Sequence, residues 1–398
     1  MASGEQKLGC LSSEPPLSSP QDPDHLAPSL QDPDLAPLGS GADEDLGSFD
    51  VDSYDLLAGP EEYDNEDDDE DDDMETTCPG ERFTRKQARE ITDRWVNARG
   101  EQTMRHWNLC QEILKGGDEN AILPPYPLKI LPETTLLCAY RGYCYHREYR
   151  TCDPSMTRAV LGYDKPQQML QVFSLTLSSS ESYPISLYGS FAVRDYLEPL
   201  RNYVFNRTRD DPVTIEQDSF ALPLCSPCRG MYVEDRIFFE VDLWVKKEGD
   251  GSADKQLLFA YVEVYSRSNS EMKVKTGRIS RDHCLLDMGF LFLPHSVEAV
   301  IEVFVNADIH HHVRFTAFSS GLINEIILFN GKGHGKGKLF QHVVVVSSGG
   351  ELKVCLELEK SLFWWTFQDG AVGAVCLPDD SISDQYHVRV FFAPKNLQ

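Results

Sequence analysis

The chain has 398 residues and a formal net charge of −27, and its acidic residues are unevenly distributed. Residues 1 to 80 carry 24 acidic side chains against one basic side chain, whereas the rest of the chain carries 40 acids against 36 bases. A nearly neutral body argues against a broad phosphate-binding surface, so we expect no nucleic-acid partner.

No targeting signal is recognisable in the sequence. Residues 1 to 30 lack the basic start and apolar run of a secretory signal, and no segment approaches about eighteen consecutive apolar residues. The 11 cysteines follow no regular framework, which is typical of reduced thiols. We therefore expect a cytoplasmic or nuclear protein without a membrane segment.

Residues 1–79 are predicted to form an acidic disordered tail. Pro, Ser, Asp and Glu dominate this region, and the segment from Glu61 to Glu75 is almost wholly acidic, so it cannot bury enough apolar surface to fold. Apolar residues between Leu46 and Leu57 alternate loosely with acids, a pattern that can fold onto a partner but is also common in solvated tails. We expect the tail either to attract a basic protein partner or only to confer solubility.

Residues 80–118 are predicted to be helical. Thr84 and Gln87 have the spacing of a capping box at a helix start, and apolar residues then recur at helical spacing. Gly100 is expected to break the helix into two pieces, and Gly116 with Gly117 to end it. Residues 119–167 follow as an irregular connector that begins with a proline-rich run, Pro124 to Pro127.

Residues 168–398 are predicted to form a large antiparallel β domain, as a sandwich or a flattened barrel, because many segments alternate with period two and no long helical pattern separates them. In one segment Phe239, Val241 and Leu243 are expected to face the core. Ser348 to Gly350 are expected to form a hairpin turn between two strands. The predicted strands cover residues 173–177, 185–193, 237–245, 257–265, 297–305, 313–318, 323–329, 341–347, 352–359 and 386–392. The fold class is thus mainly β, with a short N-terminal helical segment and a disordered acidic tail.

From about residue 168 to 394 the order of several short motifs resembles a plant family, abundant in grasses, known as domain of unknown function 6598. The motifs are Leu170–Leu175, Pro184–Gly189, Val193–Asp195, Tyr203–Arg207, Arg209–Pro212, Arg229-Gly230 and Phe239–Leu243.

This resemblance implies an architecture more than a function. Some members are fused to a ribosome-inactivating N-glycosidase, which by analogy suggests an accessory domain. We find no Glu-Ala-x-x-Arg motif for such an enzyme, and the chain ends at Gln398 just after its last predicted strand. Where relatives have Gly-Pro before Arg-Gly, this chain has Cys225-Ser226-Pro227-Cys228.

The pair Cys225 and Cys228 has the spacing of half a zinc site or of a redox motif. A structural zinc site needs four ligands, usually in two such pairs, and the possible complement of Cys138, Cys144, His146 and Cys152 lacks that spacing. A redox pair is expected at the start of a helix, whereas this pair precedes a strand. Two unconnected thiols are the favoured interpretation.

The run His310–His312 could include metal ligands. Neighbouring residues on a strand point to opposite faces, so at most two of the histidines could bind one ion, and Asp308 would be a weak third ligand. A polar loop between two strands is the favoured interpretation.

The glycine- and lysine-rich segment Gly331–Lys338 looks like a phosphate cradle. It fits neither a P-loop nor a dinucleotide-binding spacing, and a strand rather than a helix is expected to follow. We interpret it as a basic connection between strands, with weak anion binding as the alternative.

In the connector, tyrosines and arginines are interleaved in a way that can stack bases and bind phosphates. Packing of this segment against the edge of the sandwich is the favoured interpretation. The residues are Tyr140, Arg141, Tyr143, Tyr145, Arg147, Tyr149 and Arg150.

No catalytic motif is found, so we predict no catalytic, cofactor-binding or metal-ligating residue and no cofactor. The favoured hypothesis is a non-enzymatic interaction or scaffold module of plant cells, with a protein partner still to be identified. The alternative is a loop-built enzyme or carbohydrate-binding protein, because the carboxylates of a glycosidase can lie far apart in sequence.

Overall fold

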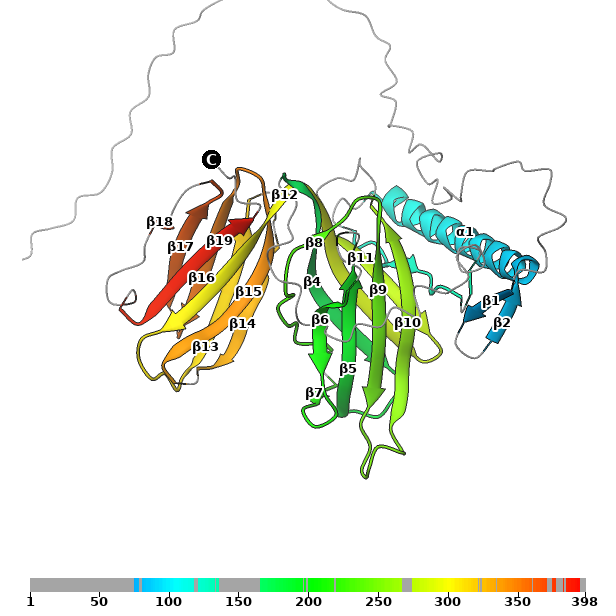
Figure 1. Cartoon of the computed structure of the whole chain (residues 1–398), viewed down its shortest axis with the longest axis horizontal. Coiled ribbons are helices and arrows are strands. Elements are labelled where there is room, and N and C mark those ends of the chain that lie inside the picture. Colours follow the sequence, from blue (N-terminus) through cyan, green and yellow to red (C-terminus); the bar gives the residue numbers. More distant parts are fainter. Residues whose placement is uncertain are drawn as a thin grey trace, which may run out of the picture. The chain divides into compact units, whose positions relative to one another are not determined.

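The computed structural model (Figure 1) describes residues 75–78, 81–117, 121–132, 134–135, 165–195, 197, 200–217, 220–266, 274–320, 322, 324–333, 335–359, 361–370, 374–376, 382 and 384–393. The described chain is mainly β, as predicted, with a helix close to its start. No helix in these residues is long and apolar enough to cross a membrane.

The helix begins and ends where the sequence predicts. Strands β1 (Glu75–Cys78) and β2 (Glu81–Thr84) pair antiparallel and lead into α1 (Arg85–Lys115). The Thr84 hydroxyl accepts a hydrogen bond from the backbone N–H of Gln87, and the Gln87 side chain accepts one from the N–H of Thr84, which completes the capping box. Gly116 is the C-cap residue.

The predicted break at Gly100 is wrong, because α1 continues through this residue. Glycine inside a helix costs about 1 kcal/mol relative to alanine, and contacts on both sides of Gly100 offset that cost. The Trp95 indole N–H donates to the carbonyl oxygen of Ile130 at 2.7 Å, and the hydroxyls of Thr103 and Tyr126 lie 3.3 Å apart.

Two sheets pack around the first core and form what we call the first sandwich. One sheet has the order β10-β9-β5-β6, with β7 also paired to β5, and the other has the order β3-β11-β12-β4-β8. The bounds are β3 (Tyr126–Leu128), β4 (Gln167–Ser179), β5 (Ile185–Arg194), β6 (Asn202–Arg207), β7 (Val213–Ile215), β8 (Met231–Tyr232), β9 (Arg236–Val245), β10 (Lys255–Tyr265), β11 (Lys275–Arg281) and β12 (Cys284–Val305).

A second sandwich encloses a second core. Its one sheet has the order β14-β13-β16-β17-β18, and β15 and β19 pair with the C-terminal half of β12 to complete its other layer. The bounds are β13 (His312–Ser319), β14 (Ile326–Lys332), β15 (Gly337–Ser347), β16 (Glu351–Leu358), β17 (Ser361–Gln368), β18 (Ala374–Cys376) and β19 (Tyr386–Ala393). Apart from the parallel pair β3–β11, the strand pairs that the structure describes are antiparallel.

The 22-residue strand β12 belongs to both sandwiches (Figure 1). Its N-terminal half pairs with β4 and β11, and its C-terminal half pairs with β15 and β19. The register shifts between Leu293 and Ser296, where His295 has a φ of 49° and the Ser296 hydroxyl donates to the carbonyl oxygen of Leu293 at 2.9 Å. This irregularity marks the passage of the strand from one core to the other.

The predicted register of β9 is confirmed. Phe239, Val241 and Leu243 are fully buried in the first core, together with residues from the facing sheet such as Leu286 and Met288. The second core is centred on Phe315, Val354 and other apolar residues of β12, β13, β15 and β16.

The prediction of a hairpin at Ser348 to Gly350 is wrong in part. A turn is present, since the N–H of Gly350 donates to the carbonyl oxygen of Ser347 at 2.8 Å. The strands on either side do not pair with each other, however, because β15 pairs with β12 and β16 pairs with β13 and β17. The turn therefore carries the chain from one sheet of the second sandwich to the other.

Candidate functional site

The candidate site lies on the outer face of the sheet β10-β9-β5-β6. Alternation places the odd-numbered residues of β9 in the core and Glu240, Asp242 and Trp244 on the opposite face. Their partners in register include Tyr188 on β5, opposite Trp244, and Tyr261 on β10, opposite Glu240. We call this surface the outer aromatic face, after the aromatic residues that register places on it: Tyr188, Tyr203, Phe238, Trp244 and Phe259. Tyr261 and Tyr265 lie on the same side of the sheet, but Tyr261 is buried and Arg99 of α1 lies over the Tyr265 ring.

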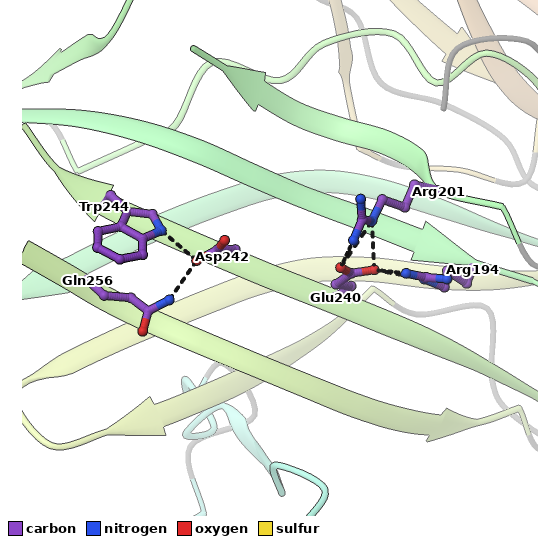
Figure 2. Close-up of polar contacts among 6 residues, drawn as sticks. All are labelled: Arg194, Arg201, Glu240, Asp242, Trp244 and Gln256. Atoms are coloured by element: carbon purple, nitrogen blue, oxygen red, sulfur yellow. Dashed lines mark hydrogen bonds and ion pairs between the residues drawn. The ribbon is translucent and has the colours of Figure 1, made fainter. Parts of the chain in front are cut away.

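Asp242 fixes the position of the Trp244 indole. Its Oδ1 accepts hydrogen bonds from Trp244 Nε1 at 2.7 Å and from Gln256 Nε2 at 2.9 Å (Figure 2). The Tyr188 ring is nearly parallel to the indole, with 6.4 Å between the ring centroids and 19° between the planes. The two nearly parallel rings come from directly opposite residues of neighbouring strands, and together they form what we call the Tyr188–Trp244 platform.

Asp254 holds the other end of this platform. The Tyr188 hydroxyl donates to Asp254 Oδ2 at 2.8 Å, and Arg209 Nε donates to the same oxygen at 2.7 Å. The Arg209 hydrogen bond holds the pKa of Asp254 well below its usual range, while burial and then the hydrogen bond to Asp254 raise the pKa of Tyr188. Both side chains therefore keep their protonation states at neutral pH.

Glu240 forms a second polar group on the same face (Figure 2). Arg194 Nε donates to Glu240 Oε2 at 2.7 Å, and Arg201 Nη2 donates to Oε1 at 2.6 Å. Only 5% of the Glu240 side chain is exposed, so the carboxylate is buried between two guanidinium groups. Such an arrangement compensates a buried charge and orders the face.

A third set of buried charges connects the end of β5, the loop before β8 and the C-terminal half of β12. Arg229 Nη2 donates to Asp195 Oδ1 at 2.7 Å, and the N–H of Tyr232 donates to Asp195 Oδ2 at 2.8 Å. The N–H of Gly230 donates to Glu298 on β12, and burial raises the pKa of that carboxyl. The loop before β8 is thereby tied both to β5 and to β12.

Cys225 and Cys228 lie in this same loop, and neither forms a disulfide. The backbone N–H and the Sγ of Cys228 lie 2.8 and 3.2 Å from Asn202 Oδ1, and burial raises the pKa of Cys225 to about 11. A thiol with so high a pKa is protonated and unreactive at neutral pH.

Beside Cys225 lies a small pocket of about 20 Å³, which is room for about one water molecule. His342 also lines this pocket. Burial lowers the pKa of His342 to about 4, despite a hydrogen bond with the backbone of Leu328.

The histidine run and the glycine-rich segment connect strands. His312 begins β13, and His311 Nε2 lies 3.1 Å from the Tyr386 hydroxyl. Residues 333–336 join β14 to β15, so a strand follows the glycine-rich segment as predicted. A search of the described residues finds no group of three side chains that could hold a metal ion.

Two sequence features fall outside the described residues. The acidic run from Glu61 to Asp73 is one, and the connector segment with Tyr140 to Arg150, including Cys138, Cys144, His146 and Cys152, is the other.

The outer aromatic face was not predicted from the sequence. Alternation in β9 predicts that Glu240 and Asp242 point away from the core, but it does not reveal that Tyr188 and Trp244 are neighbours. The signal that was available is a large aromatic residue at an outward position of a strand, where a polar residue is expected.

Comparison with known proteins agrees with the resemblance seen in the sequence. The model of the family described as a domain of unknown function, DUF6598, matches residues 169–362. This part of the chain belongs to the DUF6598 family. No curated protein matches the chain.

Among solved structures, similarity is weak. A human GIVD cytosolic phospholipase A2 is 10% identical with a TM-score of 0.21, and covers 58% of this chain and 31% of its own. The C2A and C2B domains of Extended-Synaptotagmin 2 are 7% identical with a TM-score of 0.22, and cover 61% of this chain and 96% of their own. This chain therefore spans about a third of that phospholipase, and TM-scores this low carry no argument about fold or function.

Proposed function

We propose that this chain is a non-catalytic interaction module that binds a macromolecule through the outer aromatic face. The observation that carries the proposal is the position of that face. Its aromatic residues lie on the far side of β9 from a core that is already filled by residues such as Phe239 and Val241. Aromatic side chains with a polar partner are typical of binding surfaces rather than of solvated sheet faces.

The chemistry of the described charged groups supports a binding role over a catalytic one. Glu240 and Asp195 are buried in ion pairs with arginines, and a carboxylate held in this way serves structure rather than proton transfer. The thiols of Cys225, Cys284 and Cys355 have pKa values raised to about 11 by burial. The competing hypothesis of a loop-built enzyme would need converging acids in a cleft.

The acidic tail supplies a second contact in this proposal. Residues 1–79 would draw in a basic protein partner, because a strong field of one sign raises association rates with the opposite sign. Like charge would repel nucleic acid. The five free cysteines of the described chain are compatible with a reducing compartment, which supports the proposal that the protein works in the cytoplasm or nucleus of a plant cell.

The experiment is affinity capture from plant extract with the full chain as bait. Captured protein is identified by mass spectrometry and captured polysaccharide by sugar analysis after hydrolysis. The double variant Tyr188→Ala/Trp244→Ala is expected to lose the main ligand, whereas Trp364→Ala, on the outer face of the second sandwich, is expected to retain it. A chain that starts at Gly80 is expected to lose only those basic partners whose capture weakens between roughly 0.05 and 0.3 M salt.

The outcome that would overturn the proposal is equally direct. If the Tyr188→Ala/Trp244→Ala variant is folded and captures the same ligands in the same amounts as the wild type, the outer aromatic face is not the binding surface.

A further inference from the structure

The Tyr188–Trp244 platform has a geometry that points to one class of ligand, and the inference below rests on the proposed function. Figure 2 shows the Trp244 indole face-on above the ribbon of β9, with Asp242 and Gln256 beside it. The nearly parallel ring of Tyr188 extends this surface towards β5. Both aromatic side chains are half-buried, so one face of an elongated, flat apolar surface is within reach of a ligand.

The platform is held in place before any ligand binds. The indole N–H is tied to Asp242, which also accepts from Gln256, and the Tyr188 hydroxyl is tied to Asp254. Hydrogen bonds of this kind lower the loss of side-chain freedom on binding, because the rings already have their bound orientation. A sheet face that only had to be solvated would not need them.

Polar acceptors lie at the edge of the platform. The hydrogen bonds that the structure describes use Oδ1 of Asp242 and Nε2 of Gln256, which leaves Oδ2 of Asp242 and Oε1 of Gln256 to accept from a ligand. The Gln256 side chain is exposed. Acceptors beside an aromatic ring suit a ligand that presents C–H groups on one face and hydroxyl donors along its edges.

Charges around the platform compensate one another. Asp254 is paired with Arg209, and Glu181 with Lys247 and Lys255. The remaining carboxylate next to the indole, Asp242, makes a phosphate-bearing ligand unfavourable. The unused carboxylate and amide oxygens of Asp242 and Gln256 suit the hydroxyl donors of an uncharged ligand.

We propose that the Tyr188–Trp244 platform binds a neutral β-1,4-linked polysaccharide. The C–H face of one sugar ring would lie on the Trp244 indole and that of its neighbour on the Tyr188 ring, while Asp242 and Gln256 accept hydrogen bonds from the hydroxyl groups. A β-1,4-linked chain of glucose, xylose or mannose units can form an extended ribbon with successive rings nearly in one plane, which suits two nearly parallel aromatic rings on neighbouring strands.

A nucleobase is the main competing ligand, because bases also stack on aromatic rings. Single-strand binding sites combine such rings with a basic groove that follows the phosphates. Here the charged residue next to the indole is the acidic Asp242, which would repel a phosphate. A short oligothymidylate therefore serves as the control ligand.

The test is isothermal titration of the full chain with cellohexaose, xylohexaose and mannohexaose, and with the oligothymidylate. We expect one of the hexasaccharides to bind and the oligothymidylate not to bind. The Trp244→Ala variant should lose about tenfold or more in affinity, and Gln256→Ala should lose less. Trp364→Ala should bind as the wild type does, and thermal unfolding of each variant shows whether the sheet is intact.

The results separate the two proposals. If none of the three hexasaccharides binds, or if Trp244→Ala binds as tightly as the wild type, the polysaccharide inference is wrong. If capture from extract nevertheless depends on Tyr188 and Trp244, the face remains a binding surface for another ligand. Binding of the oligothymidylate with loss in Trp244→Ala would replace the sugar by a nucleobase.

Discussion

The two sandwiches differ in how the large apolar side chains on their outer sheet faces are exposed and held in place. In the first sandwich, Trp244 lies on the outer face but is hydrogen-bonded to Asp242 and parallel to Tyr188. In the second sandwich, Leu362 and Trp364 on β17 are 58% and 37% exposed, and Ile327 on β14 is 48% exposed. Ile327 and Trp364 lie in one cross-strand row, separated by Thr316 and Cys355.

On the outer face of the first sandwich, Tyr188 and Trp244 are held by hydrogen bonds, whereas the exposed large apolar side chains of the second sandwich form a surface without such bonds among the described residues. Among the described residues the indole of Trp364 has a ring contact with Phe318, with 5.5 Å between centroids, and no hydrogen bond to its N–H. A ring without a polar partner can adopt several orientations, so it favours loose association over recognition of one ligand. The first sandwich therefore offers the better candidate for specific binding, although the second has the more exposed apolar side chains.

The largest expected effect tests whether the two cores are independent. Val241→Asp places an unpaired carboxylate in the first core and Val354→Asp does the same in the second, since both valines are fully buried. Each substitution should cost about 4 kcal/mol or more of unfolding free energy. Because β12 hydrogen-bonds within both sandwiches, we expect urea denaturation to show one transition for both variants.

Two separate transitions would contradict this expectation. They would show that the sandwiches unfold independently, with the irregularity at Leu293 to Ser296 as the boundary. A variant with wild-type stability would instead mean that the register of its strand is wrong.

A smaller effect follows from a titratable group in the second core. His342 is buried there, and its pKa is lowered to about 4 against about 6.5 when unfolded. The unfolded chain takes up the proton first, so the stability contributed by neutral His342 is complete above about pH 6.5 and is lost as the pH falls to about 4. The loss amounts to roughly 3 kcal/mol, and it should be absent in His342→Gln, which can still donate to the backbone of Leu328.

Denaturation at a series of pH values measures this difference between the wild type and His342→Gln. The control is Glu298→Gln, because the pH dependence of the stability that Glu298 contributes has the opposite sign. The raised pKa of Glu298 means that its contribution is present below the unfolded pKa and is lost as the pH rises through the folded one. If the curves of wild type and His342→Gln run parallel between pH 6.5 and 4, His342 is not the acid-sensitive group.

The sequence predicted those elements in which alternation is clear. β9 and the C-terminal half of β12 have one face in a core and polar or charged residues on the other, so period two is visible in them. The capping box at Thr84 was equally readable, because it depends on local hydrogen bonds alone.

Other elements were missed for identifiable physical reasons. The N-terminal half of β12 is buried on both faces from Phe290 to Leu293, since Phe290 and Phe292 pack in the first core whereas Leu291 and Leu293 pack in a separate apolar cluster on the other face. Its sequence is therefore a continuous apolar run without alternation. β17 has apolar residues on both faces, with Leu362 and Trp364 exposed and Trp365 and Phe367 buried. The alternation of apolar and polar residues that marks a strand is therefore absent from its sequence. The outer aromatic face could not be predicted, because it depends on which strands become neighbours.

The smallest expected effect on stability concerns the exposed residues of the second sandwich. Leu362→Thr should change the free energy of unfolding by no more than about 0.5 kcal/mol, because this side chain is exposed and threonine suits a strand. Trp364→Thr should cost more, about 1 kcal/mol or somewhat above, because its ring contacts Phe318. Both variants should nevertheless reduce concentration-dependent association, which sedimentation velocity measures, since removal of exposed apolar area weakens non-specific contacts. Trp244→Ala is the matched control, because its indole is half-buried and held by Asp242, and it should leave the sedimentation profile unchanged. If Trp364→Thr abolishes capture of a specific ligand instead, recognition belongs to the second sandwich rather than to the first.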